Sequence, residues 1–133
     1  MGDAGVFQPL LLALSISPQH SSYALLEQGK AFSVNVLKKA QLNVAAHFAQ
    51  SAQADKLASI VWTAGRTGAP LLQDCLAWFE CRLVSEIPAG DHVLALGQVI
   101  EGRLLDAAAE PMIYRDTGAL DGASALFPEV FGD

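Results

Sequence analysis

Gly90, Asp91 and His92 are the residues of this chain whose types and spacing most clearly suggest chemistry. They connect two long runs of strand character, residues 75–86 and 93–104, so a tight turn between strands is expected here. An ionisable side chain at such a turn points toward whatever the end of the sheet holds. Because histidine changes charge close to neutral pH, a positioned His92 could transfer protons or bind an anionic ligand. The alternative is a turn histidine in water.

The first half of the chain alternates predicted strands and helices that would position such a site. Strict alternation of leucine or isoleucine with smaller residues indicates a first strand, which Pro18 ends. Ser21 or Ser22 can then cap a short helix that closes at Gly29. The predicted elements are a strand over 10–17, a helix over 21–29, a strand over 32–36 and a helix over 40–50.

The second half reads mainly as strands. Odd positions from 75 to 83 are apolar and form the expected core face, whereas Glu80 and Arg82 on the other face suggest partial exposure. Gly97 marks a bulge or a close approach by other backbone. The predicted elements are a short strand at 60–62, a turn at 65–70, a bent strand over 71–86, a long strand over 93–104 and a last short strand over 111–115. About six strands with two short helices favour a small closed or nearly closed barrel.

Composition excludes several classes of protein. The 133 residues suit a single domain, and the net charge of −6 argues against a nucleic-acid binder. The apolar run 10–14 is too short to span a bilayer, so a cytoplasmic protein without a membrane segment is expected. Cys75 and Cys81, six apart in one strand-like run, are expected to face the same side as buried thiols. No spacing of metal ligands is present, and no metal is expected.

Six stretches in a fixed order together resemble the flavin reductase-like family. They are Gln8-Pro9-Leu10-Leu11-Leu12, Phe32-Ser33-Val34-Asn35-Val36-Leu37, Gln41 with residues 45–48, Thr67-Gly68-Ala69-Pro70, Leu76-Ala77-Trp78-Phe79-Glu80-Cys81 and Gly90-Asp91-His92. The resemblance implies an FMN-binding split β-barrel, a single domain over 1–133. It also implies a homodimer that binds FMN, takes hydride from NADH or NADPH and passes electrons to free flavin, a partner oxygenase or another acceptor.

The resemblance also implies a set of site residues. The segment from Ser17 to Ser22 matches the part of the family that meets the flavin phosphate and ribityl chain. Serine hydroxyls and backbone N–H groups at a helix start suit a phosphate, although simple helix capping by Ser21 and Ser22 explains them equally well. His20 stands where a more basic residue would hold the phosphate better.

Other positions carry over from the same family pattern. Phe48 and Ala49 match the place where the chain passes the isoalloxazine ring, with a core role for Phe48 as the alternative. His92 matches a catalytic histidine beside the flavin and the nicotinamide. Tyr114 and Arg115 are expected to contact the nicotinamide nucleotide or the other subunit, or else to be a solvated strand end.

The sequence departs from the family pattern at its start. Family members begin with two further strands, one of which lines the flavin, whereas here residues 1–6 lead almost directly into the first predicted strand. The barrel is therefore expected to be incomplete at its N-terminus. An alternative function follows, namely a non-catalytic split-barrel domain that dimerises or binds a partner and has lost flavin binding.

Overall fold

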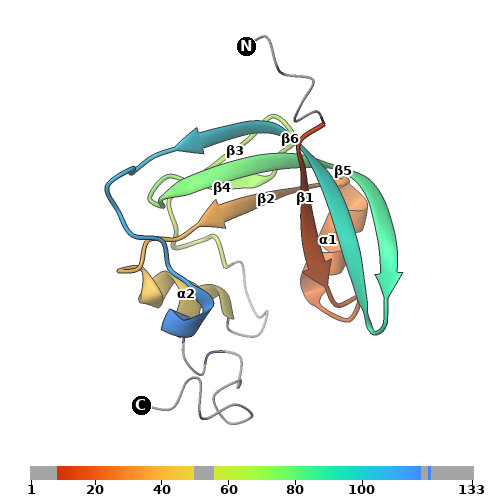
Figure 1. Cartoon of the computed structure of the whole chain (residues 1–133), viewed down its shortest axis with the longest axis horizontal. Helices are drawn as coiled ribbons and strands as arrows, with labels where there is room; N and C mark the ends of the chain where they lie inside the picture. The colour runs from red at the N-terminus through yellow and green to blue at the C-terminus, as the bar shows by residue number, and fades with distance from the viewer. Residues whose placement is uncertain (1–8, 50–55, 118–119, 121–133) are drawn as a thin grey trace.

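The computed structural model describes residues 9–49, 56–117 and 120, and its main element is a curled antiparallel sheet (Figure 1). Four strands build this sheet in the order β1-β6-β5-β2. Their bounds are Leu11–Ile16 for β1, Ala31–Val36 for β2, Ala77–Ala89 for β5 and His92–Leu104 for β6. The curl gives the sheet the shape of half a barrel, with β1 and β2 at its two edges.

Helices and a second small sheet complete the described fold. Their bounds are Ser21–Gly29 for α1, Leu42–Ala49 for α2, Trp62–Ala64 for β3, Pro70–Leu72 for β4 and Tyr114–Thr117 for the 3₁₀ helix η2. Strands β3 and β4 pair with each other in antiparallel fashion. The fold is mainly β with two short α-helices, which confirms the fold class predicted from hydrophobic periodicity.

Helix α1 has unusual residues at both of its caps. His20 is the N-cap, and its Nδ1 accepts a 3.1 Å hydrogen bond from the backbone N–H of Ser22. Lys30 ends the helix in the left-handed conformation, with φ at 52°, and its N–H donates to the Leu26 carbonyl. The expectation that Ser21 or Ser22 caps the helix was wrong, because both serines already lie within its first turn.

The hairpin between β5 and β6 is closed by Gly90 and Asp91 alone. Ala89 pairs with His92 across the two strands, so His92 is the first residue of β6. Gly90 has φ at 65°, which a glycine adopts without steric cost. The tight strand-to-strand connection predicted from the sequence is confirmed.

A β-bulge at Val84 changes which side chains of β5 face α1. Leu83 lies opposite Gly97 but Ser85 lies opposite Leu96, so Val84 is an extra residue in β5. Beyond the bulge Glu86 pairs with Ala95. Because Ala95 and Gly97 lie two residues apart on β6, Glu86 shares the face of Leu83.

Gly97 lets an aromatic ring approach the centre of the sheet. A Cβ atom at this position would lie 2.5 Å from two ring atoms of Phe32 and 2.8 Å from the Cβ of Cys81. The close approach predicted at Gly97 is therefore present, although the neighbour is a side chain rather than backbone.

The strand predicted over 71–86 is broken in the structure. Residues 73–76 belong to no strand, so β4 and β5 are separate elements. Cys75 is buried in one cluster with Leu71, Leu72 and Trp78, whereas Cys81 is buried in another. The prediction that both cysteines share one strand face was therefore wrong. Both are buried free thiols as expected, and burial raises the pKa of each.

Two further expectations fail for local reasons. Glu80 is only 1% exposed, because the 65–67 segment covers its carboxylate, whereas Arg82 is exposed as predicted. No strand covers 111–115, where Pro111 forms a single isolated bridge. Asp116 instead curls this segment into η2, since its carboxylate accepts a hydrogen bond from the Ile113 N–H and its own N–H donates to the Ile113 carbonyl.

Candidate functional site

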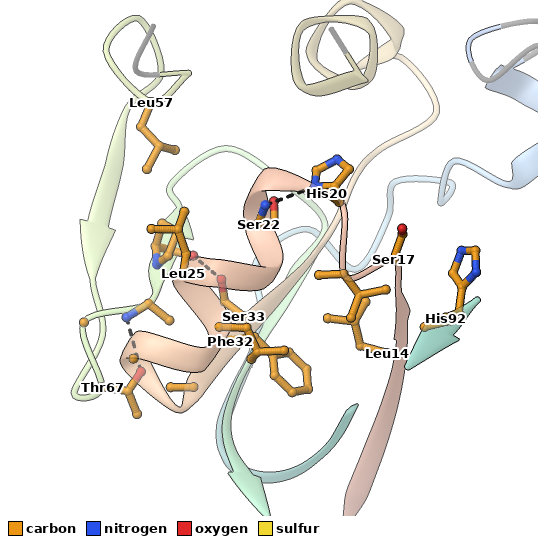
Figure 2. A pocket seen from close by; sticks show the side chains of 18 residues that line it. Leu14, Ser17, His20, Ser22, Leu25, Phe32, Ser33, Leu57, Thr67 and His92 are labelled. Atoms are coloured by element: carbon orange, nitrogen blue, oxygen red, sulfur yellow. Dashed lines mark hydrogen bonds between the residues drawn. The ribbon is translucent and has the colours of Figure 1, made fainter. Parts of the chain in front are cut away.

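A pocket of about 800 Å³ lies between the end of β1, helix α1, the start of β2 and the turn at residues 65–70 (Figure 2). Four of the residues predicted from the sequence line it, namely Ser17, His20, Ser22 and His92. A volume in this range suits a small organic ligand or cofactor. The pocket is therefore the candidate site.

Strand pairing brings Ser17 and His92 together from distant parts of the sequence. Ile16 pairs with Val93 at the end of the β1–β6 ladder, so the residues that flank this pair, Ser17 and His92, lie at the same end of the sheet (Figure 2). The antiparallel register of two strands, rather than any local motif, creates this part of the pocket.

The turn between β1 and α1 fixes the orientation of His20. Its backbone N–H donates to the Ser17 carbonyl at 2.9 Å, and its Nδ1 accepts from the Ser22 N–H. The neutral imidazole therefore carries its proton on Nε2. His20 thus caps α1 with one nitrogen and retains a second nitrogen as a donor for a ligand in the pocket.

His92 is held by its neighbour at the tip of the hairpin. Its Nδ1 lies 2.9 Å from Oδ1 of Asp91, and the hydrogen bond and charge of the imidazole lower the pKa of the Asp91 carboxyl. The Asp91 side chain is 97% exposed, so this pair orients the ring but contributes little to stability. His92 itself is 46% exposed and can meet a second ligand that arrives from solvent.

The remaining walls of the pocket are mostly apolar or small. They are formed by Leu14, Leu25, Leu26, Phe32, Leu57 and the turn residues Thr67, Gly68, Ala69 and Pro70. None of the described lining residues is a lysine or an arginine. Hydroxyls and a helix start on one side, with apolar walls opposite, fit a ligand that joins a phosphate to a flat aromatic ring.

The other predicted site residues lie elsewhere in this chain. Ser21 starts α1 but does not line the pocket. Phe48 packs against the cluster that contains Cys75, at the end of α2 beside Ala49. Tyr114 and Arg115 lie in η2, which contacts α2. These last four residues thus form a second group, and none of them lines the pocket.

The turn at 65–70 was predicted from the sequence and belongs to the family pattern, but none of its residues was predicted to be in the site, of which it forms one wall. Thr67, Gly68 and Pro70 all line the pocket, and Gly68 has φ at 89°. A Thr-Gly pair ahead of a proline indicates a shaped turn, but the sequence alone does not show which cavity that turn borders.

The described part of the chain offers neither a membrane span nor a metal site. None of the helices there is long and apolar enough to cross a membrane. Residues 9–49, 56–117 and 120 contain no group of three or more histidine, cysteine, aspartate or glutamate side chains placed to hold a metal ion.

Comparison with known proteins identifies the family. The model of the flavin reductase like domain matches residues 6–122. The chain belongs to the flavin reductase-like family. A probable flavin reductase of Rhizobium meliloti is 36% identical over 91 residues, which cover 68% of this chain and 29% of that protein. The reductase subunit HsaB of a flavin-dependent monooxygenase from Rhodococcus jostii is 37% identical over 92 residues, covering 69% of this chain and 47% of HsaB.

Solved structures of the family have the same fold. The NADH:FAD oxidoreductase SgcE6 of Streptomyces globisporus superposes with a TM-score of 0.73 at 28% identity, covering 79% of this chain and 64% of SgcE6. SgcE6 has also been solved in complex with NAD and FAD fragments. The split-barrel fold expected from the resemblance is confirmed. The chain spans less than half the length of the Rhizobium and Rhodococcus relatives that it matches.

Proposed function

We propose that this chain is an NAD(P)H-dependent flavin reductase domain whose flavin, FMN, binds in the pocket at the start of α1. The observation that carries the proposal is the pocket itself, which combines serine hydroxyls, a helix N-terminus and a histidine with apolar walls. Membership of the flavin reductase-like family supports the same chemistry. Bound flavin would supply the capacity to accept hydride, while the protein orients and shields it.

The phosphate of FMN would bind at the N-terminal end of α1. Ser17 and Ser22 line this end with their hydroxyls, and His20 can donate from Nε2. The partial positive charge of a helix start favours an anion there. Because the described lining contains no lysine or arginine, the affinity for phosphate would rest on these neutral or weakly basic donors.

His92 would act on the nicotinamide side of the pocket. Its ring is partly exposed and is oriented by Asp91, so it can hydrogen-bond a nucleotide that enters from solvent. As a cation it would also favour the negative charge of reduced flavin. This role makes His92 the proposed catalytic residue.

The second group of residues suggests a homodimer. None of the residues Phe48, Ala49, Tyr114 and Arg115 lines the pocket of its own chain, so we propose that they reach flavin or nicotinamide across a subunit interface. Ile113 and Tyr114 are each 57% exposed, which supports an apolar contact surface near η2. Analytical ultracentrifugation would test this, and a monomer at all concentrations would contradict it.

Reduced flavin would pass to a partner oxygenase. HsaB is named as the reductase subunit of a flavin-dependent monooxygenase, which supports a partner of that class. We also place the protein in the cytoplasm, where its two buried thiols would stay reduced. Cell fractionation with an antibody to the protein would test this location.

A flavin titration tests the proposal directly. FMN fluorescence should be quenched on addition of the protein, and NADH or NADPH should then be oxidised with FMN as acceptor. FAD is the matched comparison, because SgcE6 is named for FAD. Tighter binding of FAD would correct the choice of flavin. Binding of neither flavin would contradict the function and favour a non-catalytic dimerisation or partner-binding domain.

A further inference from the structure

Glu80 is a buried carboxylate that the proposed chemistry does not use. Its side chain is 1% exposed, although it lies on β5 opposite Glu101. Burying a carboxylate is costly unless hydrogen bonds replace its water. The partners of Glu80 therefore indicate why the chain places a charge here.

The hydrogen bonds that hold the Glu80 carboxylate come from the turn between β3 and β4. The backbone N–H of Thr67 donates to Oε2 at 2.6 Å, and the Thr67 hydroxyl donates to the same oxygen at 2.7 Å. The backbone N–H of Arg66 contributes as well. Burial alone would raise the pKa of Glu80, but these donors outweigh it and hold the pKa below its usual value.

Gly65 makes room for the carboxylate. A Cβ atom at position 65 would overlap both carboxylate oxygens of Glu80, so only a glycine fits here without a shift. The turn and the carboxylate are thus fitted to each other at close range. Gly65 itself does not line the pocket, so its contact with Glu80 is separate from any contact with a ligand.

The segment that Glu80 holds is a wall of the pocket. Thr67, Gly68 and Pro70 line the cavity (Figure 2). The Thr67 hydroxyl donates to Glu80 and accepts from the Ala69 N–H at 3.2 Å, and the Gly68 N–H donates to the Gly65 carbonyl at 3.0 Å. The polar groups of the wall are therefore paired within the protein, which leaves a surface suited to the flat face of an aromatic ring.

We propose that Glu80 is a positioning residue for flavin binding, acting through Thr67 to fix the turn at 65–70 as the wall of the pocket. This inference rests on the proposed function, because it assigns to Glu80 an effect on the affinity for flavin. Glu80 itself does not line the cavity and touches no ligand there. If the Glu80 carboxylate is removed, two donors of Thr67 lose their acceptor, and these hydrogen bonds no longer hold the turn against β5.

A double-mutant cycle with FMN as the probe tests this role. Glu80→Met removes the oxygen that accepts both Thr67 hydrogen bonds and should raise the dissociation constant for FMN about tenfold. Thr67→Val removes one of the two donors and should raise the constant by a smaller factor. Because both changes break one linkage, the double variant should bind FMN about as weakly as Glu80→Met alone. Gly65→Ala, which keeps the charge but displaces the carboxylate, should weaken binding as well.

Cys75→Ala is the control for general loss of stability. Cys75 is 1% exposed and lies in the other core cluster, so this variant should lower the melting temperature while the FMN affinity stays unchanged. Wild-type protein that binds FMN, together with a Glu80→Met variant of equal affinity or with additive effects in the cycle, would overturn the role of Glu80 alone. Wild-type protein that does not bind FMN would overturn the proposed function and this inference with it. Should Glu80→Met fail to fold, unchanged affinity in Gly65→Ala would overturn the inference.

Discussion

The Tyr23 hydroxyl donates a 2.7 Å hydrogen bond to the carboxylate of Glu86 and thereby ties α1 to β5. Glu27, one turn further along α1, joins this contact. The Oε2 atom of Glu27 is buried and meets no donor among the described residues. A hydrogen bond that the protonated Glu27 carboxyl donates to Glu86, followed by burial, raises the pKa of Glu27. The pKa of Glu86 is lowered, first by Glu27 and then by Tyr23. Of these two coupled carboxyl groups, Glu27 is therefore the one that takes up a proton first as the pH falls.

The opposite pKa shifts of Glu27 and Glu86 predict a pH-dependent stability. The stabilisation from Glu27, whose pKa is raised on folding, is present below its usual value of 4.5 and is lost as the pH rises through the raised value. The stabilisation from Glu86 has the opposite sign and is lost as the pH falls through its lowered pKa. Glu27→Gln cannot ionise and still donates to Glu86, so it should gain stability relative to wild type as the pH rises.

Thermal melts of both proteins between about pH 4 and pH 8 check this prediction. The melting temperature of Glu27→Gln should exceed that of wild type by a margin that widens toward neutral pH. Lys30 lies 3.8 Å from Glu27 and offsets part of the lost stability, although the repulsion from Glu86 is the stronger of the two effects. Parallel curves at all pH values would show that folding does not raise the pKa of Glu27.

Substitutions can separate the two roles of His20, which are to cap α1 through Nδ1 and to donate to the phosphate through Nε2. His20→Ala removes the acceptor for the Ser22 N–H and should cost about 1 kcal/mol of stability. Asparagine is a good N-cap residue, so His20→Asn should restore the stability but not the Nε2 donor. If His20 contacts the phosphate, FMN affinity will stay low in both variants. Recovery of affinity in His20→Asn would assign the histidine to capping alone.

His92→Ala should separate binding from turnover. We expect kcat/KM for NADH to fall at least about tenfold, while the FMN dissociation constant changes much less. Asp91→Asn is the matched control, because it weakens the exposed pair that orients the ring but keeps the imidazole. Steady-state kinetics and FMN titration measure both quantities. Full activity in His92→Ala would reduce His92 to a residue of the turn.

Gly97→Ala should disturb the pocket from within the sheet. The new methyl group would overlap the ring of Phe32, which lines the pocket, and the Cβ of Cys81. We expect a loss of about 1–3 kcal/mol in stability together with weaker FMN binding. Gly29→Ala is the control, since a methyl group there would meet no atom within 4 Å and the variant should fold at least as well as wild type. Denaturant unfolding of both variants measures the difference.

Local patterns in the sequence predicted most of the elements but not their breaks. The alternation from Leu10 to Ile16 correctly indicated β1, because one face of that strand packs on the core. The same reasoning carried a strand through 73–76, where the apolar residues instead belong to an irregular segment whose Cys75 enters a separate cluster. Periodicity cannot distinguish these two cases, since both bury the same kinds of side chain.

The pocket depended on contacts between distant segments. Ser17 and His92 were each predicted as site residues, yet only the β1–β6 register brings them to one cavity. Glu80 was expected to be partly exposed because its alternation placed it on the outer face of β5. Its burial follows from the Thr67 turn, which nothing in the local sequence of β5 reveals.

The bulge at Val84 adds one residue to β5 that has no partner of its own on β6. Val84 is 51% exposed, so many side chains should be accepted there. Deleting the residue would restore regular pairing, and Glu86 would still lie opposite Ala95, on the same face as Leu83 and within reach of Tyr23. A library that varies Val84 and a variant that lacks the residue should therefore both retain the contact between Tyr23 and Glu86.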